Sequence, residues 1–320
     1  MYPNIKIHPT EKIMKIAFIY AGQGSQYVGM GKEFYKECTT FRKIFDNSPV
    51  EFDLKKTCFE NNNNLNKTEY TQPCIIAYQI GITNVLLENG IKPEYVAGIS
   101  LGEYAALYTA GVWTANKTIE IVSFRGKIME DCVKELDCKT VSIIGLSNDF
   151  VEKICKECSN LGVVEITNYC CSGNITIGGE RLAVDAAVKT AYSQGAKHCI
   201  KLKSDYPFHT KLLQIAGEKL FEYINKTDME EMKVPVVFNY TGSPLKENES
   251  IPYLLKMQVQ NCIYLEKSIR YLANMGVDTI IEIGPQNNIS NIIKRICPSM
   301  KVFPVDEPKS IKYLIHHITS

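Results

Sequence analysis

Ser100 lies at the centre of a glycine-flanked motif, GISLG over residues 98–102, which could present a nucleophile. An apolar run ends at Ala97 and a helical pattern follows the motif, so we expect a sharp turn between a strand and a helix. The nucleophile of such a turn has a strained backbone, and glycines beside it supply the necessary room. The same spacing is common by chance, and a serine before a helix is more often an N-cap. Ser100 is therefore a nucleophile or a helix cap, and other residues must decide.

A serine nucleophile needs a base within hydrogen-bonding reach, and the five histidines of the chain are the candidates. His209 is the best of them, because Pro207 restricts the backbone before it and a helical pattern follows it. The others are His8 near the N-terminus, His198 in a lysine-rich strand, and His316 and His317 at the C-terminus. For an isolated histidine, a structural or solvent-facing side chain is the commoner role.

Arg125 is a candidate for binding a carboxylate. Residues 114–133 have apolar side chains at helical spacing, with Ile121 and Ile128 on one side and Arg125 on a neighbouring line, so its guanidinium can point inward. A guanidinium makes two parallel hydrogen bonds to a carboxylate and so orients it. An arginine on the surface of an amphipathic helix is about equally common.

The bulk composition excludes several classes of function. The chain has 320 residues, 45% of them hydrophobic, and a formal net charge of +1, which gives no global field for nucleic acid or an anionic membrane. No apolar stretch reaches about 18 residues and no cleavable leader is evident, so neither a membrane span nor export is expected. The twelve cysteines are scattered, and neither Cys155-x-x-Cys158 nor Cys170-Cys171 fits a zinc site. We expect reduced thiols, no metal, no cofactor and a cytoplasmic monomer.

The order of strand-like and helical segments predicts an α/β protein. Residues 1–14 are expected to form a flexible leader. Residues 15–135 and 206–320 have the alternation of a parallel α/β body, whereas residues 136–205 have the order β-α-β-β-α-β of a ferredoxin-like subdomain. The small subdomain is therefore an insertion in the body.

Two long helical segments are expected in the body. The first starts at Thr71, because Pro73 suits the first turn of a helix, and it ends at Gly90. The second covers residues 253–276.

Seven short motifs occur in the order and approximate spacing of one enzyme family. They are AGQGSQYVGMG (21–31), TQP (71–73), GISLGEYAALYTAG (98–111), FRGKIM (124–129), PFHT (207–210), KMQV (256–259) and EIGP (282–285). Over about residues 16–305 the chain resembles the malonyl-CoA:acyl carrier protein transacylases, including the free-standing acyltransferases that serve polyketide synthases. The resemblance implies an α/β-hydrolase-like body with a ferredoxin-like subdomain. It also implies transfer of a malonyl group from malonyl-CoA to the phosphopantetheine thiol of an acyl carrier protein, in fatty-acid or polyketide synthesis.

The same resemblance implies catalytic roles for four residues. Ser100 is the acylated nucleophile and His209 its general base and acid in a Ser-His dyad, without a third carboxylate. The family orients this histidine through a backbone carbonyl near the position of Gln258. The backbone N–H groups of Gln23 and Leu101 form the oxyanion hole, which stabilises charge that develops in the transition state.

Substrate binding is likewise implied by the resemblance. Arg125 matches the arginine that holds the free carboxylate of the malonyl group, and it would disfavour acetyl-CoA, which leaves the cation unpaired. The other residues expected at the substrate site are Ile99, Phe208, Asn168 and Gln258. Ile99 stands where the family has histidine, and Cys170 falls within an altered N-x-N-S-P motif, so the preferred acyl group, including a substituted malonyl unit, is left open.

Two other functions remain open at this point. An acyl hydrolase on the same fold would clear acyl groups from carrier proteins, with water in place of the thiol, although a carboxylate-binding arginine has no use there. A catalytically silent carrier-docking module would not need Ser100, His209, Gln23 and Arg125 together. For an acidic carrier, we expect a local basic surface that includes Lys201, Lys203 and Lys211.

Overall fold

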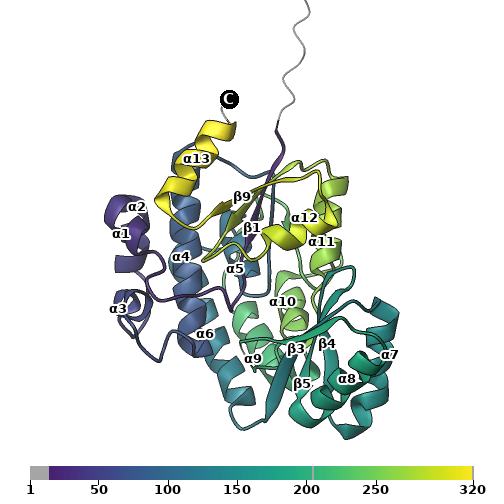
Figure 1. Cartoon of the computed structure of the whole chain (residues 1–320). Helices are drawn as coiled ribbons and strands as arrows, with labels where there is room; N and C mark the ends of the chain where they lie inside the picture. The colour runs from purple at the N-terminus through teal and green to yellow at the C-terminus, as the bar shows by residue number, and fades with distance from the viewer. Residues whose placement is uncertain (1–13, 204, 319–320) are drawn as a thin grey trace, which may run out of the picture.

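The computed structural model describes residues 14–203 and 205–318, which form a larger body and a smaller lobe (Figure 1). The body contains a five-stranded parallel sheet in the order β7-β2-β1-β8-β9. Its strands are β1 (Ile16–Tyr20), β2 (Tyr95–Gly98), β7 (Val236–Val237), β8 (Thr279–Ile283) and β9 (Lys301–Val305). The predicted leader, residues 1–14, lies outside the described residues except for Met14.

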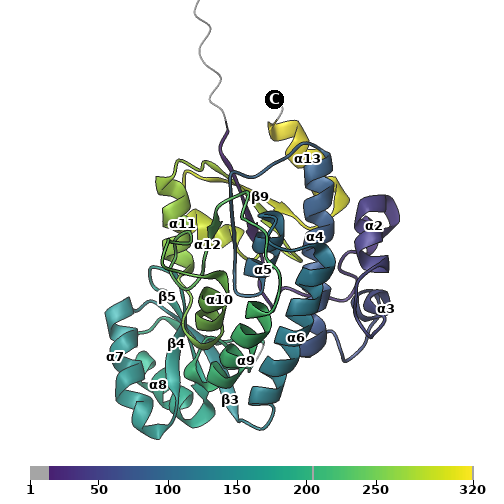
Figure 2. The ribbon, with the colours of Figure 1, turned by 180° about the vertical axis from the view of Figure 1, so that it is seen from behind.

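The central strand β1 contributes to a hydrophobic core on each face of the sheet. Phe18 and Tyr20 belong to one core, with side chains from α4, α5 and α6, whereas Ala17 and Ile19 belong to the other, with side chains from α11 and α12. Figures 1 and 2 show these two groups of helices on opposite sides of the sheet. Because both faces are covered, the strand is apolar throughout and not alternating.

The helices of the body follow or precede these strands. They are α1 (Lys32–Glu37), α2 (Thr39–Asp46), α3 (Leu54–Phe59), α4 (Thr68–Glu88), α5 (Gly102–Thr109), α6 (Ala115–Val133), α9 (Gln214–Asn225), α10 (Ile251–Gln260), α11 (Leu265–Asn274), α12 (Ser290–Ile296) and α13 (Pro308–Ile318), with a 3₁₀ turn at Lys211–Leu213. Helix α4 begins at Thr68, three residues before the predicted start at Thr71, and it contains Pro73 near its N-terminal end.

The smaller lobe is a four-stranded antiparallel sheet with two helices. Its elements are β3 (Cys138–Ile144), α7 (Asn148–Cys158), a 3₁₀ turn (Ser159–Leu161), β4 (Val164–Cys171), β5 (Asn174–Glu180), α8 (Arg181–Ser193) and β6 (His198–Lys201). The strand order β4-β5-β3-β6 is that of a ferredoxin-like sheet, and the lobe has its own apolar core. The predicted fold class, an α/β body with a small ferredoxin-like subdomain, is confirmed.

A short backbone contact joins the two lobes. The N–H of Tyr169 on β4 donates to the carbonyl of Ile263 (3.0 Å), and the N–H of Ile263 donates to the carbonyl of Thr167 (3.0 Å). These bonds form an isolated parallel β-bridge between Ile263 and Asn168. This contact divides the helical segment expected over residues 253–276 into two helices, α10 and α11.

Candidate active site

Ser100 lies in a tight turn between β2 and α5. Its backbone has a φ of 53°, in the left-handed region that residues with a side chain rarely occupy. A Cβ atom on Gly98 would lie 2.1 Å from the carbonyl carbon of Gly102, and one on Gly102 would lie 2.3 Å from the carbonyl oxygen of Tyr20. Only glycine fits at either position. Ser100 does not cap α5, whose N-cap is Leu101, so its hydroxyl is available for chemistry.

His209 lies beside this hydroxyl. Its Nε2 is 2.8 Å from Ser100 Oγ, and its Nδ1 is 2.5 Å from the carbonyl oxygen of Gln258. Because a carbonyl only accepts, Nδ1 carries the proton and donates it, which leaves Nε2 free to accept the serine hydroxyl proton. Burial lowers the pKa of His209 to about 4; the hydrogen bond to Gln258 opposes this shift and the charge of Arg125 adds to it. The imidazole is therefore neutral near pH 7, as a general base must be.

Arg125 reaches the same hydroxyl from α6, and its side chain is 1% exposed. Nη2 donates to Ser100 Oγ (3.3 Å) and to Gln258 Oε1 (3.2 Å), while Nη1 donates to Gln72 Oε1 (2.8 Å). The guanidinium also lies over the ring of Tyr104, 5.3 Å from its centroid. Its Nε has no hydrogen-bond partner, and no carboxylate lies within ion-pairing distance among the described residues. A buried cation without a paired anion is costly, so this site favours a ligand that carries a carboxylate.

Gln23 and Leu101 are the two residues expected to form the oxyanion hole beside Ser100. The side chain of Gln23 donates to Thr68 Oγ1 (2.6 Å), and the residue lines the same cavity as Ser100. Leu101 directly follows Ser100 and is fully buried. Neither backbone N–H is used in a hydrogen bond among the described residues, so both are available to an oxyanion. Their oxyanion role stays a prediction.

A cavity of about 170 Å³ opens in front of Ser100, between the body and the smaller lobe. The body contributes Ile99 and Phe208 to its wall, and the smaller lobe contributes Asn168 and three threonines, Thr140, Thr167 and Thr176. The Oδ1 atom of Asn168 is buried and has no hydrogen-bond partner among the described residues. Ile99, next to the nucleophile, makes the wall apolar at the position where histidine was the family expectation. The cavity can therefore hold a short acyl chain beside Ser100.

Three buried residues at this site had been given no role from the sequence. Gln72 accepts from Arg125, and Glu103 and Asn239 hydrogen-bond to each other behind Ser100. Gln72 belongs to the TQP motif, and Glu103 directly follows the G-x-S-x-G motif, so a signal existed for both. Asn239 gave no signal, because it lies 139 residues from Ser100 in the sequence.

The three lysines of the expected basic surface differ in their surroundings. Lys201 pairs with Asp205 (3.1 Å) and Lys211 pairs with Glu165 (3.6 Å). Lys203 is exposed and lines a cavity together with Gln23. Two of the three charges are therefore partly neutralised, and the basic surface is weaker than the sequence suggested.

The described residues carry no other candidate centre. They contain no group of three histidine, cysteine or acidic side chains placed to hold a metal ion. All twelve cysteines are free thiols. Over the part of the chain that the structure describes, no helix is both long and apolar enough to span a bilayer.

Comparisons with known proteins show the family and the overall fold of the chain. The family model of the acyl transferase domain matches residues 17–308. The malonyl CoA-acyl carrier protein transacylase of Bacillus subtilis (strain 168) is 33% identical over 305 residues, which cover 94% of this chain and 96% of the relative. The crystal structure of a malonyl CoA-acyl carrier protein transacylase from Clostridium perfringens superposes with a TM-score of 0.92 at 35% identity, covering 95% of this chain and 97% of the other. A malonyl-transacylase solved in complex with its type II PKS acyl-carrier protein gives a TM-score of 0.91 at 30% identity, covering 95% and 99%.

Proposed function

The chain belongs to the acyl transferase family that contains the malonyl CoA-acyl carrier protein transacylases, and on that premise we propose that it transfers a malonyl group from malonyl-CoA to the phosphopantetheine thiol of an acyl carrier protein. The observation on which this proposal rests is the buried Arg125: it pairs with no carboxylate of the described residues, and its Nη2 lies 3.3 Å from Ser100 Oγ. A malonyl group has an acyl carbon for Ser100 and a free carboxylate for Arg125. An acetyl group has the acyl carbon but no carboxylate.

The first half-reaction forms an acyl-enzyme. Ser100 Oγ attacks the thioester carbon of malonyl-CoA while His209 Nε2 accepts the hydroxyl proton. The backbone N–H groups of Gln23 and Leu101 hold the oxyanion of the tetrahedral intermediate. The intermediate collapses, the carbon–sulfur bond breaks, and His209 returns the proton to the coenzyme A sulfur. Malonyl-Ser100 remains.

The second half-reaction runs the same steps with the carrier. His209 accepts the proton of the phosphopantetheine thiol, the sulfur attacks malonyl-Ser100, and the ester oxygen leaves as Ser100 takes the proton back. The result is ping-pong kinetics, with coenzyme A released before the carrier reacts. Arg125 holds the malonyl carboxylate in both half-reactions, so the acyl carbon keeps its place between them.

Hydrolysis is the competing outcome on this fold. It differs only in the acceptor, since water would attack malonyl-Ser100 in place of the thiol. A carboxylate-binding arginine at full burial does not help an enzyme that clears simple acyl chains, so transfer is favoured. The assembled Ser100 and His209, at 2.8 Å, disfavour a catalytically silent docking module.

Intact-protein mass spectrometry tests the proposal. The protein is mixed with malonyl-, methylmalonyl- and acetyl-CoA in turn, and the acylated residue is mapped; malonyl addition on Ser100 is expected to be fastest. A phosphopantetheinylated acyl carrier protein is then added, and carrier acylation and free malonate are followed in one reaction. A stable acyl group on a cysteine, or release mainly as free acid with the carrier present, would contradict the proposed transfer.

A further inference from the structure

The neighbouring strand β7 continues toward the nucleophile turn in register. Strands β2 and β7 pair in parallel, with Ala97 opposite Val237, so the same register extended by two residues would place Asn239 opposite Ile99. In a parallel ladder, the backbone of the residue opposite Ile99 would bond to the carbonyl before Ile99 and to the amide after it. Those two groups belong to Gly98 and Ser100.

The side chain of Asn239 makes these two bonds in place of its backbone. Its Oδ1 accepts the N–H of Ser100 at 2.5 Å, and its Nδ2 donates to the carbonyl of Gly98. A carboxamide has the donor and acceptor of a peptide group, so it can replace one where a strand ends. Asn239 is 5% exposed, and its two bonds fix the backbone on both sides of Ile99, directly before the strained Ser100.

Glu103 holds Asn239 from the other side of the turn. It lies in the first turn of α5, is fully buried, and accepts the backbone N–H of Asn239 on Oε2 at 2.6 Å. Gln258 on α10 and the charged Arg125 on α6 also face this carboxyl. Burial raises the pKa of Glu103 to about 8, so the group is largely protonated near neutral pH and serves as an acceptor without a full charge.

We propose that Asn239 and Glu103 form one positioning unit for the nucleophile, which holds the backbone of Ser100 in its left-handed conformation. This inference deepens the proposed function and rests on it for the substrate. Because Asn239 accepts the N–H of Ser100, that amide is not available to an oxyanion, whereas the N–H of Leu101 has no hydrogen-bond partner among the described residues. Neither Asn239 nor Glu103 contacts the reacting atoms, so both act through Ser100.

Substitutions at the two positions test the unit. Asn239→Ala removes both bonds to the turn, and Glu103→Ala removes the bond to Asn239. A misplaced nucleophile costs up to about 100-fold in rate. We therefore expect the maximal rate constant of self-malonylation to fall by about 10- to 100-fold in each variant. KM for malonyl-CoA should stay within about threefold, since the binding of the carboxylate by Arg125 is not altered. Glu103→Gln keeps the acceptor and should restore most of the rate.

The double variant Asn239→Ala/Glu103→Ala distinguishes one unit from two separate effects. Residues that act through the same bond are not additive, so the double variant should be no slower than the slower single variant. Asn89→Ala is the matched control, because its side chain also bonds to a backbone carbonyl, that of Val85, but at the far end of α4. This control should change the thermal midpoint at most slightly and leave the rate unchanged.

A fluorophosphonate, which phosphonylates active-site serines without needing a carboxylate, gives a second rate for every variant. If the wild type reacts with the fluorophosphonate but not with malonyl-CoA, the proposed function fails while the fluorophosphonate rates still test the positioning unit. Wild-type rates in Asn239→Ala, a loss in KM alone, or Glu103→Gln as slow as Glu103→Ala would overturn the inference. Should Asn239→Ala not fold, the comparison of Glu103→Ala with Glu103→Gln decides the same question.

Discussion

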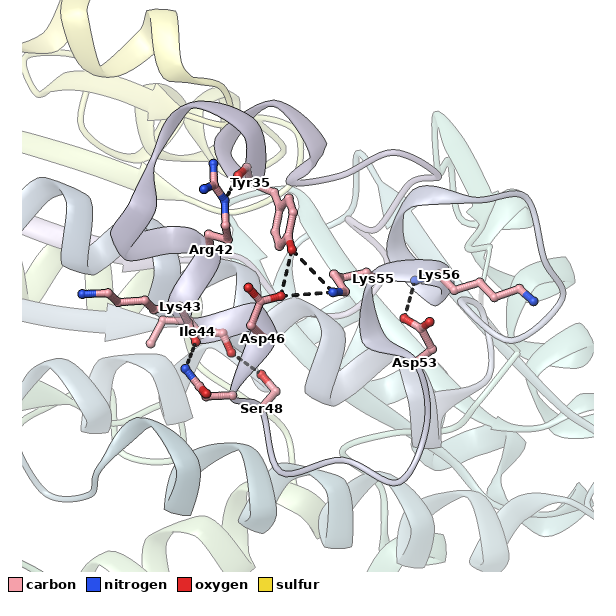
Figure 3. Close-up of polar contacts among 10 residues, drawn as sticks. Tyr35, Arg42, Lys43, Ile44, Asp46, Ser48, Asp53, Lys55 and Lys56 are labelled. Atoms are coloured by element: carbon pink, nitrogen blue, oxygen red, sulfur yellow. Dashed lines mark hydrogen bonds and ion pairs between the residues drawn. The ribbon is translucent and has the colours of Figure 1, made fainter.

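Two polar networks in this protein have hydrogen bonds of similar length but opposite surroundings. The hydrogen bonds that Ser100 Oγ makes with His209 and Arg125 measure 2.8 and 3.3 Å; Ser100 and His209 line the cavity, and Arg125 is buried. Around Asp46, on helices α1 to α3, the bonds from Tyr35 and Lys55 measure 2.8 and 3.1 Å (Figure 3).

Solvent makes the difference between the two networks. The side chains of Asp46 and Lys55 are 40% and 45% exposed, so water screens their attraction. Burial alone would raise the pKa of Asp46, but the hydrogen bonds from Tyr35 and Lys55 outweigh it and lower the pKa. At the buried site, burial dominates and lowers the pKa of His209 to about 4. Hydrogen-bond length therefore does not explain the different pKa shifts of the two networks, whereas exclusion of water does.

The largest expected effect comes from breaking the buried dyad. Ser100→Ala should abolish self-malonylation, because among the described residues Ser100 has the one hydroxyl that hydrogen-bonds to His209. His209→Ala should slow it by about 10²- to 10⁴-fold, since the nucleophile loses its general base. Intact mass after mixing with malonyl-CoA measures both rates. Ser268→Ala is the control, as this buried serine donates to the carbonyl of Tyr264 at the start of α11. An equal loss in that variant would contradict the assignment.

The next effect concerns the buried cation. Arg125→Ala should lower malonyl reactivity by about one and a half to three and a half decades, which corresponds to about 2 to 5 kcal/mol for a buried charge-assisted pair. Acetyl-CoA should become comparatively better, because the unpaired cation that excluded it is gone. The wild-type ratio of malonyl to acetyl transfer should exceed one, although the apolar Ile99 lowers it.

An arginine of the exposed network provides the control for this effect. Arg42 donates from Nε to the carbonyl of Tyr35 and from Nη2 to that of Lys36, on the surface of α1 and α2. Arg42→Ala should leave the ratio of the two acyl-CoA rates unchanged. An unchanged ratio in Arg125→Ala as well would show that the buried guanidinium does not select the substrate.

The pH dependence is a smaller effect and reports burial directly. A general base must be neutral, so activity is lost as the pH falls through the pKa of His209. With that pKa near 4 and not at the ordinary 6.5, kcat/KM for self-malonylation should stay level from pH 7 to about pH 5 and fall by half near pH 4. Brief pH jumps followed by mass spectrometry measure the profile. Half-maximal activity near pH 6.5 would mean that water reaches the imidazole.

The smallest effect is expected in the exposed network. Asp46→Ala removes the acceptor that Tyr35 and Lys55 share, yet exposed ion pairs contribute little to stability. We expect a change in the thermal midpoint of less than about 2 °C and no change in self-malonylation. A larger shift, measured by calorimetry, would show that these exposed polar contacts stabilise the protein more than expected.

Sequence reasoning found the parts of the site that are encoded locally. The glycines at 98 and 102 predict the tight turn around Ser100, because a side chain at either position would clash with the backbone of the turn. His209 and Arg125 are single residues with weak local signals, and only the ordered motifs of a family connect them with Ser100.

Contacts between distant segments were missed. Asn239 follows a strand of only two residues, and its role depends on the register of that strand beside β2. The break between α10 and α11 depends on hydrogen bonds from β4, in the other lobe, to Ile263. Both features are set by pairing partners far along the chain, and neither leaves a pattern in the residues nearby.

The strand order of the body also bears on how the protein is synthesised. β1 lies at the centre of the sheet, between β2 and β8, so one of its edges stays unpaired until Thr279–Ile283 has left the ribosome. Gln258, whose carbonyl orients His209, likewise emerges late. During translation the chain therefore exposes an apolar strand edge until β8 has been made, and the arrangement of Ser100, His209 and Gln258 is complete only after residue 258.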